Sequence, residues 1–321
     1  MANKKIIQTA LRTLQTEADT ISNLKKFINA GFVKVLETIA ASKGRLVVSG
    51  IGKSAIIAQK VVATFNSTGT PSIFMHAADA IHGDLGMVQQ EDIIIVISKS
   101  GDSPEIKVLV PLIKSFGNIL IGMVGNTDSF LARQSEYILN TTVEQEACPN
   151  NLAPTSSTTA QMVMGDALAV CLMEMKGFGT ADFAKFHPGG ALGKRLFLRV
   201  ADLAAQNEKP AVAPGAGIRE VIVEMTKKRL GVTAVVSPKN VIEGIITDGD
   251  LRRMLEKEGS FERLMAKDIM SKNPFTVEEN ILAADALDIM KIRDISQLVV
   301  VHKKIYKGII HIHDIIKEGI I

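Results

Sequence analysis

The chain has 321 residues, of which 46% are hydrophobic and 22% charged, and this composition indicates a globular protein with more than one domain. Its net charge of +3 is too small, and its basic residues too scattered, to indicate nucleic-acid binding. No apolar run approaches the roughly 18 residues that span a membrane, and the first residues contain no signal-peptide core. Two cysteines form no disulfide framework, so we expect a cytoplasmic protein with neither a membrane nor a nucleic-acid partner.

Helical and strand patterns alternate along the first half of the chain. Residues 3–29 carry apolar side chains at helical spacing and predict an amphipathic helix. From residue 45 onward, apolar strands with helical crossovers predict a five-stranded parallel sheet covered by helices on both faces. In such sheets ligands bind beyond the carboxyl ends of the strands. The predicted strands are 45–50, 72–76, 92–98, 118–124 and 137–142, and the predicted helices are 54–66, 103–116, 128–134 and 160–175.

A self-similar stretch fills the C-terminal third of the chain. Residues 225–251 align with residues 290–315, and each copy reads as helix, strand, short turn and strand. Each then continues with Gly-Ile-Ile and an acidic residue that opens a helix. The preceding segments, 200–203 and 266–270, match as well. Self-similarity over about 65 residues predicts two copies of one α+β module packed together.

Three serines and a lysine stand at the end of the third predicted strand and just after it, in the sequence SKSGDSPE. Ser103, which is followed by proline, is a good helix N-cap, but a cap explains neither Ser98 nor Ser100. Hydroxyls beside the N–H groups of a helix start, together with the charge of Lys99, are typical of a phosphate site. The sequence therefore favours phosphate binding at this loop.

Two further loops follow predicted strands. The first, GIGKSA at residues 50–55, is not a P-loop, because the first glycine of that motif would fall at Val47. It fits the dinucleotide pattern G-x-G-x-x-A only weakly, since His76 stands where that fingerprint has an acidic residue. The second, APTSSTT at residues 153–159, is either a solvated loop or a hydroxyl-rich helix start.

Six motifs are spread over nearly the whole chain: SGIGKSAIIAQK (49–60), HAADAIHGDLGM (76–87), ISKSGDSPEI (97–106), EACPNNLAPTSSTTAQMVMGDALAV (146–170), HPGGALGKRL (187–196) and GIITDGDLRR (244–253). With them the chain resembles the sugar isomerase (SIS) family of phosphosugar-binding domains. More closely, it is similar to arabinose-5-phosphate isomerases, which join one SIS domain to two cystathionine-β-synthase-type (CBS) repeats. Residues 99–102, KSGD, depart from the family, which more often has Asn and Glu around the Ser-Gly.

The resemblance implies a SIS domain over residues 1–200 and CBS repeats at 201–260 and 261–321. It implies an aldose–ketose isomerase, an intramolecular oxidoreductase, that interconverts D-ribulose 5-phosphate and D-arabinose 5-phosphate through an enediolate. That reaction is the first step of Kdo synthesis for lipopolysaccharide or capsule. The resemblance further implies a cytoplasmic homotetramer that binds a sugar phosphate and requires no cofactor. The alternatives are another phosphosugar isomerase, acting for example on hexulose phosphates, and a non-catalytic sugar-phosphate sensor.

Aldose–ketose isomerisation moves a proton between C1 and C2, so the site needs a base, oxyanion donors and an acid/base group. The family's catalytic positions carry over onto Lys53, Glu105, Glu146 and His187, and we expect burial to raise the pKa of Glu146. His187 opens a glycine-rich segment that can extend over a neighbour, so we expect it to act across a subunit boundary. The residues expected to bind substrate are Ser49, Ser54, Gly69, Thr70, His76, His82, Ser98, Ser100, Ser103, Thr155, Ser156 and Ser157.

Two other ligand sites are expected. His76 and His82, with two aspartates nearby, could bind an inhibitory Zn²⁺, and His76 is the expected ligand. CBS pairs commonly bind nucleotide-type ligands between their copies, so a nucleotide or nucleotide sugar is a possible partner of this one. Asp250 and Asp314 stand where such modules contact ribose, although both carboxylates could equally cap the helices that follow them.

Overall fold

The computed structural model describes residues 2–256 and 261–320. The chain divides into two compact units, Met1–Phe183 and Ala184–Ile321. This division falls earlier than the domain boundary predicted at residue 200. The boundary predicted between residues 260 and 261 adjoins residues 257–260, which lie outside the described residues.

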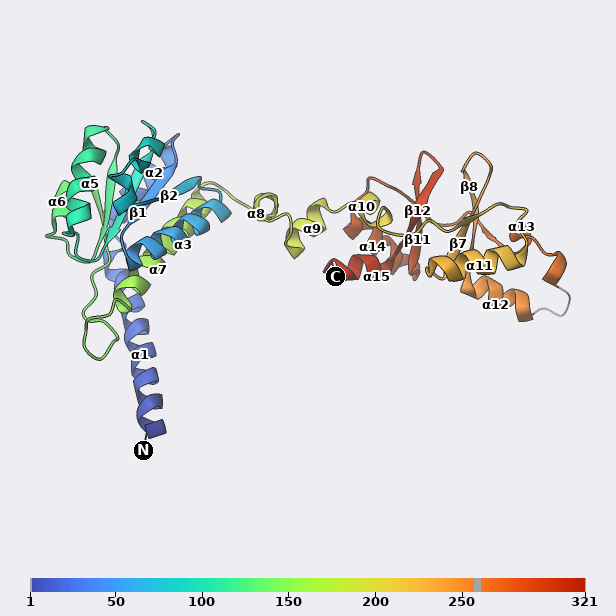
Figure 1. The fold of residues 1–321 in the computed structure, drawn as a ribbon, viewed down its shortest axis with the longest axis horizontal. Coiled ribbons are helices and arrows are strands. Elements are labelled where there is room, and N and C mark those ends of the chain that lie inside the picture. Colours follow the sequence, from blue (N-terminus) through green and yellow to red (C-terminus); the bar gives the residue numbers. More distant parts are fainter. Residues whose placement is uncertain (1, 257–260, 321) are drawn as a thin grey trace. The chain divides into compact units, whose positions relative to one another are not determined.

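The first unit is built around one five-stranded parallel sheet, as predicted (Figure 1). Its strands lie in the order β2-β1-β3-β4-β5, and every neighbouring pair is parallel. The sheet forms because each strand is a short Val/Ile-rich run, and three of the five are buried along their whole length. The strands are β1 (Leu46–Gly50), β2 (Ser72–His76), β3 (Ile93–Ser98), β4 (Leu120–Val124) and β5 (Tyr137–Asn140).

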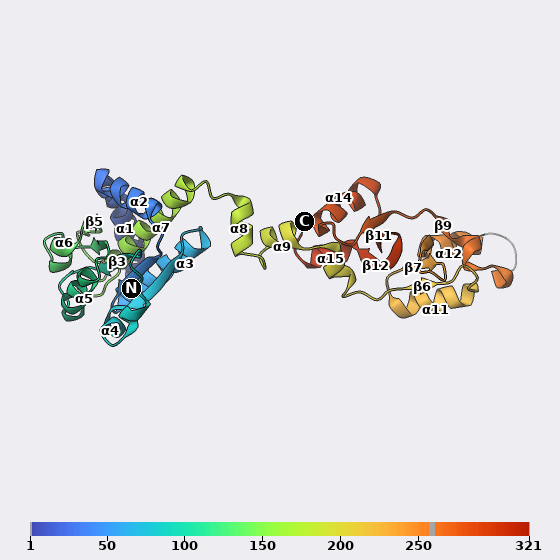
Figure 2. The same cartoon turned by 90° about the horizontal axis from the view of Figure 1, so that it is seen from above.

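Helices cover both faces of this sheet, so the unit has three layers (Figures 1 and 2). Alternate strand residues point to opposite faces and enter two separate cores: Val48 packs on one side and its neighbour Val47 on the other. The first core joins the sheet to α2 (Ala30–Ala41), α3 (Lys53–Ser67) and α7 (Ser156–Met175). The second joins it to α4 (Ala77–Ala80), α5 (Pro104–Ser115) and α6 (Phe130–Gln134).

The N-terminal segment differs from the single helix predicted over residues 3–29. It forms α1 (Ala2–Leu24) and a short 3-10 helix, η1 (Lys25–Phe27). The Asn29 side chain then accepts hydrogen bonds from two backbone N–H groups and starts α2, a helix not predicted from the sequence. Much of the apolar side of α1 is exposed, including Ile6, Leu11 and Leu14.

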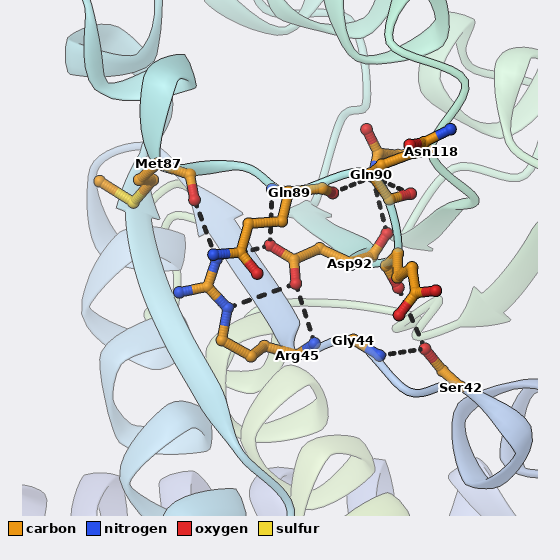
Figure 3. A network of polar contacts seen from close by, with 9 residues as sticks. Ser42, Gly44, Arg45, Met87, Gln89, Gln90, Asp92 and Asn118 are labelled. Carbon is orange, nitrogen blue, oxygen red and sulfur yellow. Dashed lines mark hydrogen bonds and ion pairs between the residues drawn. The ribbon is translucent and has the colours of Figure 1, made fainter.

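An ion pair joins β1 to β3 at their amino ends (Figure 3). Asp92 is buried, and its carboxylate accepts hydrogen bonds from the Arg45 backbone and guanidinium and from Gln89 N. Burial raises the pKa of Asp92, but the bonds from Arg45 and Gln89 outweigh it and hold the pKa below its usual value. Asn118 donates to the Asp92 carbonyl as well. This network lies at the sheet edge opposite the carboxyl ends of the strands.

The second unit contains the predicted repeat. The first copy has α11 (Ile218–Lys228), β7 (Val232–Val236), β8 (Ile242–Thr247) and α12 (Asp248–Glu256), and the second has α14 (Ala283–Arg293), β11 (Gln297–His302), β12 (Ile305–His311) and α15 (Ile312–Lys317). Each copy contributes one sheet, β6-β7-β8-β9 in the first and β10-β11-β12 in the second. The added short strands are β6 (Ala211–Val212), β9 (Ser271–Lys272) and β10 (Thr276–Glu278). The copies share a core that includes Val232 and Ala234 from one and Val299 and Ile309 from the other.

The segment around His187 joins the two units in sequence. It lies between α8 (Thr180–Phe186) and α9 (Ala191–Phe197), and α9 packs against α14 of the second unit. Lys194 Nζ on α9 lies 2.6 Å from Glu318 Oε2, just beyond α15. Within the described residues, every helix is too short or too polar to cross a membrane.

Candidate active site

A cleft of about 310 Å³ opens at the carboxyl ends of β1 and β3. It collects residues from three loops that lie far apart in the sequence, which is the arrangement predicted from the parallel sheet. Most of its lining side chains carry a hydroxyl or an amine. The lining residues are Ile51, Lys53, Ser54, Ser98, Lys99, Ser100, Ser103, Pro154, Ser157 and Thr158.

Helices α3 and α5 begin at this cleft without a side-chain cap. Gly52 and Ser103 stand at their N-cap positions, and neither accepts a capping hydrogen bond through a side chain. By contrast, the first turns of α2 and α6 are capped by Asn29 and Ser129. Uncapped N–H groups and the positive end of two helix dipoles therefore face a cleft lined with hydroxyls, and this combination suits an anion.

The serine hydroxyls fall into two groups. Ser98 and Ser54 already have protein partners, because Ser98 Oγ accepts from Gly101 N at 3.0 Å and Ser54 Oγ donates to Gln161 Oε1 at 3.2 Å. Ser103 Oγ is buried, lines the cleft and has no hydrogen-bond partner. The hydroxyls of Ser49 and Ser156 are likewise buried without a partner. A buried hydroxyl without a partner is costly in a folded protein, so Ser103 is well placed to receive a ligand oxygen.

Glu146 lies buried beside this cleft, at the start of α7. Thr155 N and Ser157 N donate to its Oε2 at 2.8 and 3.1 Å, so the carboxylate takes the first N–H groups of the helix. Its other oxygen, Oε1, lies 2.6 Å from Lys99 Nζ. Thr155, predicted to bind substrate, therefore holds Glu146: its hydroxyl also donates to Oε2, at 3.2 Å.

The pKa of Glu146 is lowered to about 2, so the expectation of a raised pKa was wrong. Burial does raise this pKa, as expected, but the Lys99 ammonium and the N–H groups of Thr155 and Ser157 outweigh it. Lys99 was noted in the sequence only for its charge, and its pairing with Glu146 was missed. The pair joins residues 47 positions apart, and no local pattern indicates it.

The remaining predicted residues lie elsewhere. Gly69 and Thr70 precede β2 at the amino edge of the sheet, where Lys176 Nζ donates to Thr70 Oγ1 at 2.9 Å. Glu105 lies half-buried in the first turn of α5 but does not line the cleft. His187 belongs to the second unit and is not among the lining residues either.

The zinc prediction rests on His76, at the end of β2. His76 Nδ1 lies 3.6 Å from Asp79 Oδ2, and His82 is exposed in the following turn. Across the described part of the chain, no three His, Cys, Asp or Glu side chains gather so that they could hold a metal ion. Inhibitory zinc therefore stays a prediction.

The matching aspartates of the two CBS copies have different surroundings. Both oxygens of Asp250 are engaged by Thr247, Arg253 and Ser271. Asp314 accepts from Asn207 Nδ2 at 2.6 Å and from the His311 backbone, and it faces a cleft of about 430 Å³. Only Asp314 of the two lines that cleft, together with Arg229, Leu230, Gly231, Asp248, Gln297, His311 and His313.

Comparisons with known proteins agree with this architecture. The SIS domain model matches residues 38–171, and the CBS domain model matches residues 200–257 and 266–320. Arabinose 5-phosphate isomerase KdsD of Pseudomonas aeruginosa is 45% identical over 99% of this chain and 98% of its own length. The chain belongs to the arabinose 5-phosphate isomerase family. KdsD of Escherichia coli K12 is 43% identical over 98% of this chain and 96% of its own length.

A solved structure is also similar to part of this chain. An E. coli CFT073 protein in complex with arabinose 5-phosphate has a TM-score of 0.57 and 39% identity to this chain. It covers 59% of this chain and 100% of its own length. The resemblance seen in the sequence motifs is therefore confirmed, both for the SIS domain and for the two CBS domains that follow it.

Proposed function

We propose that this protein is an aldose–ketose isomerase that interconverts D-ribulose 5-phosphate and D-arabinose 5-phosphate. Its near full-length similarity to arabinose 5-phosphate isomerases and the arabinose 5-phosphate complex of its structural relative support this assignment. In the molecule itself, one observation carries it: a buried carboxylate lies beside a hydroxyl-lined cleft at two uncapped helix starts. An anion-binding cleft beside a candidate base is what proton transfer on a sugar phosphate requires.

In this proposal the phosphate binds at the starts of α3 and α5. Lys53 and Ser103 contribute a charge and a hydroxyl there, and the exposed Ser100 lies on the same loop. The sugar then extends toward Glu146, which removes a proton from C1, exchanges it with solvent and delivers a proton to C2. The electron pair of the broken C–H bond forms the enediolate, whose negative oxygen needs nearby positive charge. His187 and Glu105 remain candidates for the acid/base steps at the sugar oxygens.

The cellular setting is proposed from the resemblance. The product would supply Kdo synthesis for lipopolysaccharide or capsule, in the cytoplasm. The enzyme would act as a homotetramer and would require no cofactor. A nucleotide or nucleotide sugar would bind the CBS pair, and the cleft at Asp314 would be its place.

Incubation with D-ribulose 5-phosphate in D₂O, followed by NMR, tests the activity. We expect D-arabinose 5-phosphate with deuterium at C2, at the same rate with and without a metal chelator. A panel of hexulose and sedoheptulose phosphates run in parallel separates the alternatives. Turnover of one of these phosphates, without turnover of the pentose phosphates, would indicate a different phosphosugar isomerase. Binding without any exchange would indicate a sensor.

A further inference from the structure

Lys99 stands between a buried carboxylate and open solvent. It directly follows β3, and its Nζ lies 2.6 Å from Glu146 Oε1. The Lys99 side chain is 46% exposed, whereas that of Glu146 is 0% exposed. Lys99 also lines two clefts: the hydroxyl-lined one and a second formed with Ser100, Gly125, Asn126 and Val143. The ammonium therefore has room to leave Glu146 and remain in contact with a bound ligand.

The backbone of Lys99 and the start of its side chain are closely packed against Gly125. Gly125 N donates to Lys99 O at 3.1 Å. A Cβ on Gly125 would lie 2.9 Å from Lys99 O and 3.3 Å from Lys99 Cγ, so glycine lets the β4 loop pack closely against the lysine stem. The ammonium has Glu146 as its hydrogen-bond partner, and Lys53 lines the same cleft as a second cation.

The pairing raises a chemical difficulty that suggests a role for Lys99. A carboxylate held by an ammonium and two N–H groups is a weak base, yet Glu146 is a buried carboxylate in contact with the lining residues Lys99 and Ser157. Removing a proton from C1 needs a stronger base, and the resulting oxyanion needs a positive charge. Moving one ammonium from the carboxylate to the sugar would meet both needs at once.

We propose that Lys99 is a catalytic residue that transfers its hydrogen bond from Glu146 to the substrate oxygens on binding. Glu146, released from the ammonium, takes the proton from C1, and the electron pair forms the C1–C2 double bond with negative charge on O2. Lys99 gives a proton to O2 and takes one from O1, while Glu146, after exchange with solvent, delivers a proton to C2. Lys99 ends the cycle protonated and Glu146 ionised, so atoms and charges balance. This proposal rests on the isomerase activity proposed above.

Two substitutions separate the charge of Lys99 from its proton transfer. Lys99→Met removes both, and we expect kcat to fall by about 10²-fold or more. Without the cation the pKa of Glu146 rises, so the acid limb of kcat/KM moves to higher pH. Lys99→Arg keeps the charge but cannot release a proton. Its acid limb should match the wild type while kcat still falls by about 10-fold or more.

Lys107→Met is the matched control, because it removes a lysine of the neighbouring helix that lies 3.7 Å from Asp102 and does not line the cleft. It should keep wild-type kcat and the wild-type acid limb. A Lys99→Met enzyme with normal kcat and only a raised KM would make Lys99 a phosphate ligand and overturn the proposal. Should Lys99→Met fail to fold, a Lys99→Arg enzyme with wild-type kcat would overturn proton transfer. If the wild type exchanges no sugar phosphate, the proposed function itself has failed.

Discussion

At residue 101 the serine-rich loop needs glycine for two separate reasons. Its φ is +68°, and a Cβ there would lie 2.1 Å from Ser129 Oγ. Gly101 N also donates to Ser98 Oγ, so the residue sets the course of the loop through Ser103. We expect Gly101→Ala to lower the free energy of unfolding by at least about 1 kcal/mol and to raise KM for the sugar phosphate. Urea unfolding and steady-state kinetics measure the two effects.

Gly86→Ala is the control for this change. Gly86 has no atom within 4 Å of its would-be Cβ and no positive φ. We expect the free energy of unfolding and the KM of the Gly86→Ala protein to stay near those of the wild type. Equal KM values for the Gly101→Ala and Gly86→Ala enzymes would show that the loop course does not matter for substrate binding.

At this scale, the sequence predicted part of the hydroxyl lining but not how the charges are arranged. Ser49, Thr155 and Ser156 do not line the cleft, whereas Thr158, which was not predicted, does. Ser54, Ser98, Ser100, Ser103 and Ser157 line it as expected, because each follows a parallel strand or opens a helix there. The low pKa of Glu146 depends on an ammonium from a distant loop and on the N–H groups of α7. Whether burial or hydrogen bonding dominates depends on the packed site. Residue type alone therefore could not predict whether the pKa of Glu146 would rise or fall.

Among the elements, β1 and β3 depend on a single buried carboxylate at their amino ends. Folding lowers the pKa of Asp92, so its ionised form stabilises the fold above the pH at which the unfolded chain titrates, and this contribution is lost as pH falls. We expect Asp92→Asn to lower the free energy of unfolding at neutral pH by about 3 kcal/mol. The value lies at the lower end for a broken buried pair because Arg45 stays partly exposed. Unfolding measured from about pH 5 down to about pH 2 should also show a weaker acid dependence.

Asp128→Asn provides the comparison, because Asp128 is exposed in the loop before α6. The Asp128→Asn protein should match the wild type in its free energy of unfolding and in how that free energy changes with pH. If the Asp92→Asn protein were as stable as the Asp128→Asn protein, the Arg45 pair would contribute nothing measurable to the sheet.

The five strands of the sheet could be predicted because each is a short apolar run between turn residues. Helix α2 was missed although its signal was present: Phe32, Val35, Leu36 and Ile39 follow helical spacing after the cap Asn29. Helix α7 begins four residues before the predicted start. Its first N–H groups are taken by Glu146, a partner from outside the helix that turns a hydroxyl-rich loop into a helical turn.

For the whole molecule, we expect each active site to use His187 of a neighbouring subunit. Glu146→Gln and His187→Ala proteins should each be nearly inactive, since each removes a candidate acid/base group. Refolded together, they should regain activity, because some mixed sites carry neither change. Activity plotted against the mixing ratio measures this, and we expect a maximum near equal proportions.

Subunit exchange has to be verified separately, for example with differently tagged chains. Once exchange is confirmed, activity that does not change with the mixing ratio would show that His187 acts in the site of its own chain.

The tandem repeat could be predicted at this scale because two segments of similar length share one pattern, and both copies fold as expected. The different surroundings of the matching aspartates in the two copies could not be predicted. Asp250 is bound by neighbours from three positions, whereas Asp314 faces a cleft, although both occupy the same place in the repeated pattern.

The packing of the His187 segment has an entropic consequence. A chain stretch containing Gly189, Gly190 and Gly193 would lose about 1–2 kcal/mol of backbone entropy per residue on becoming ordered. Here Gly190 N donates to His187 O, Gly193 fits against that carbonyl, and Lys194 pairs with Glu318. Much of this ordering therefore accompanies the folding of the CBS unit instead of substrate binding. Substrate affinity need not offset it, and contacts from the second repeat help to order this segment.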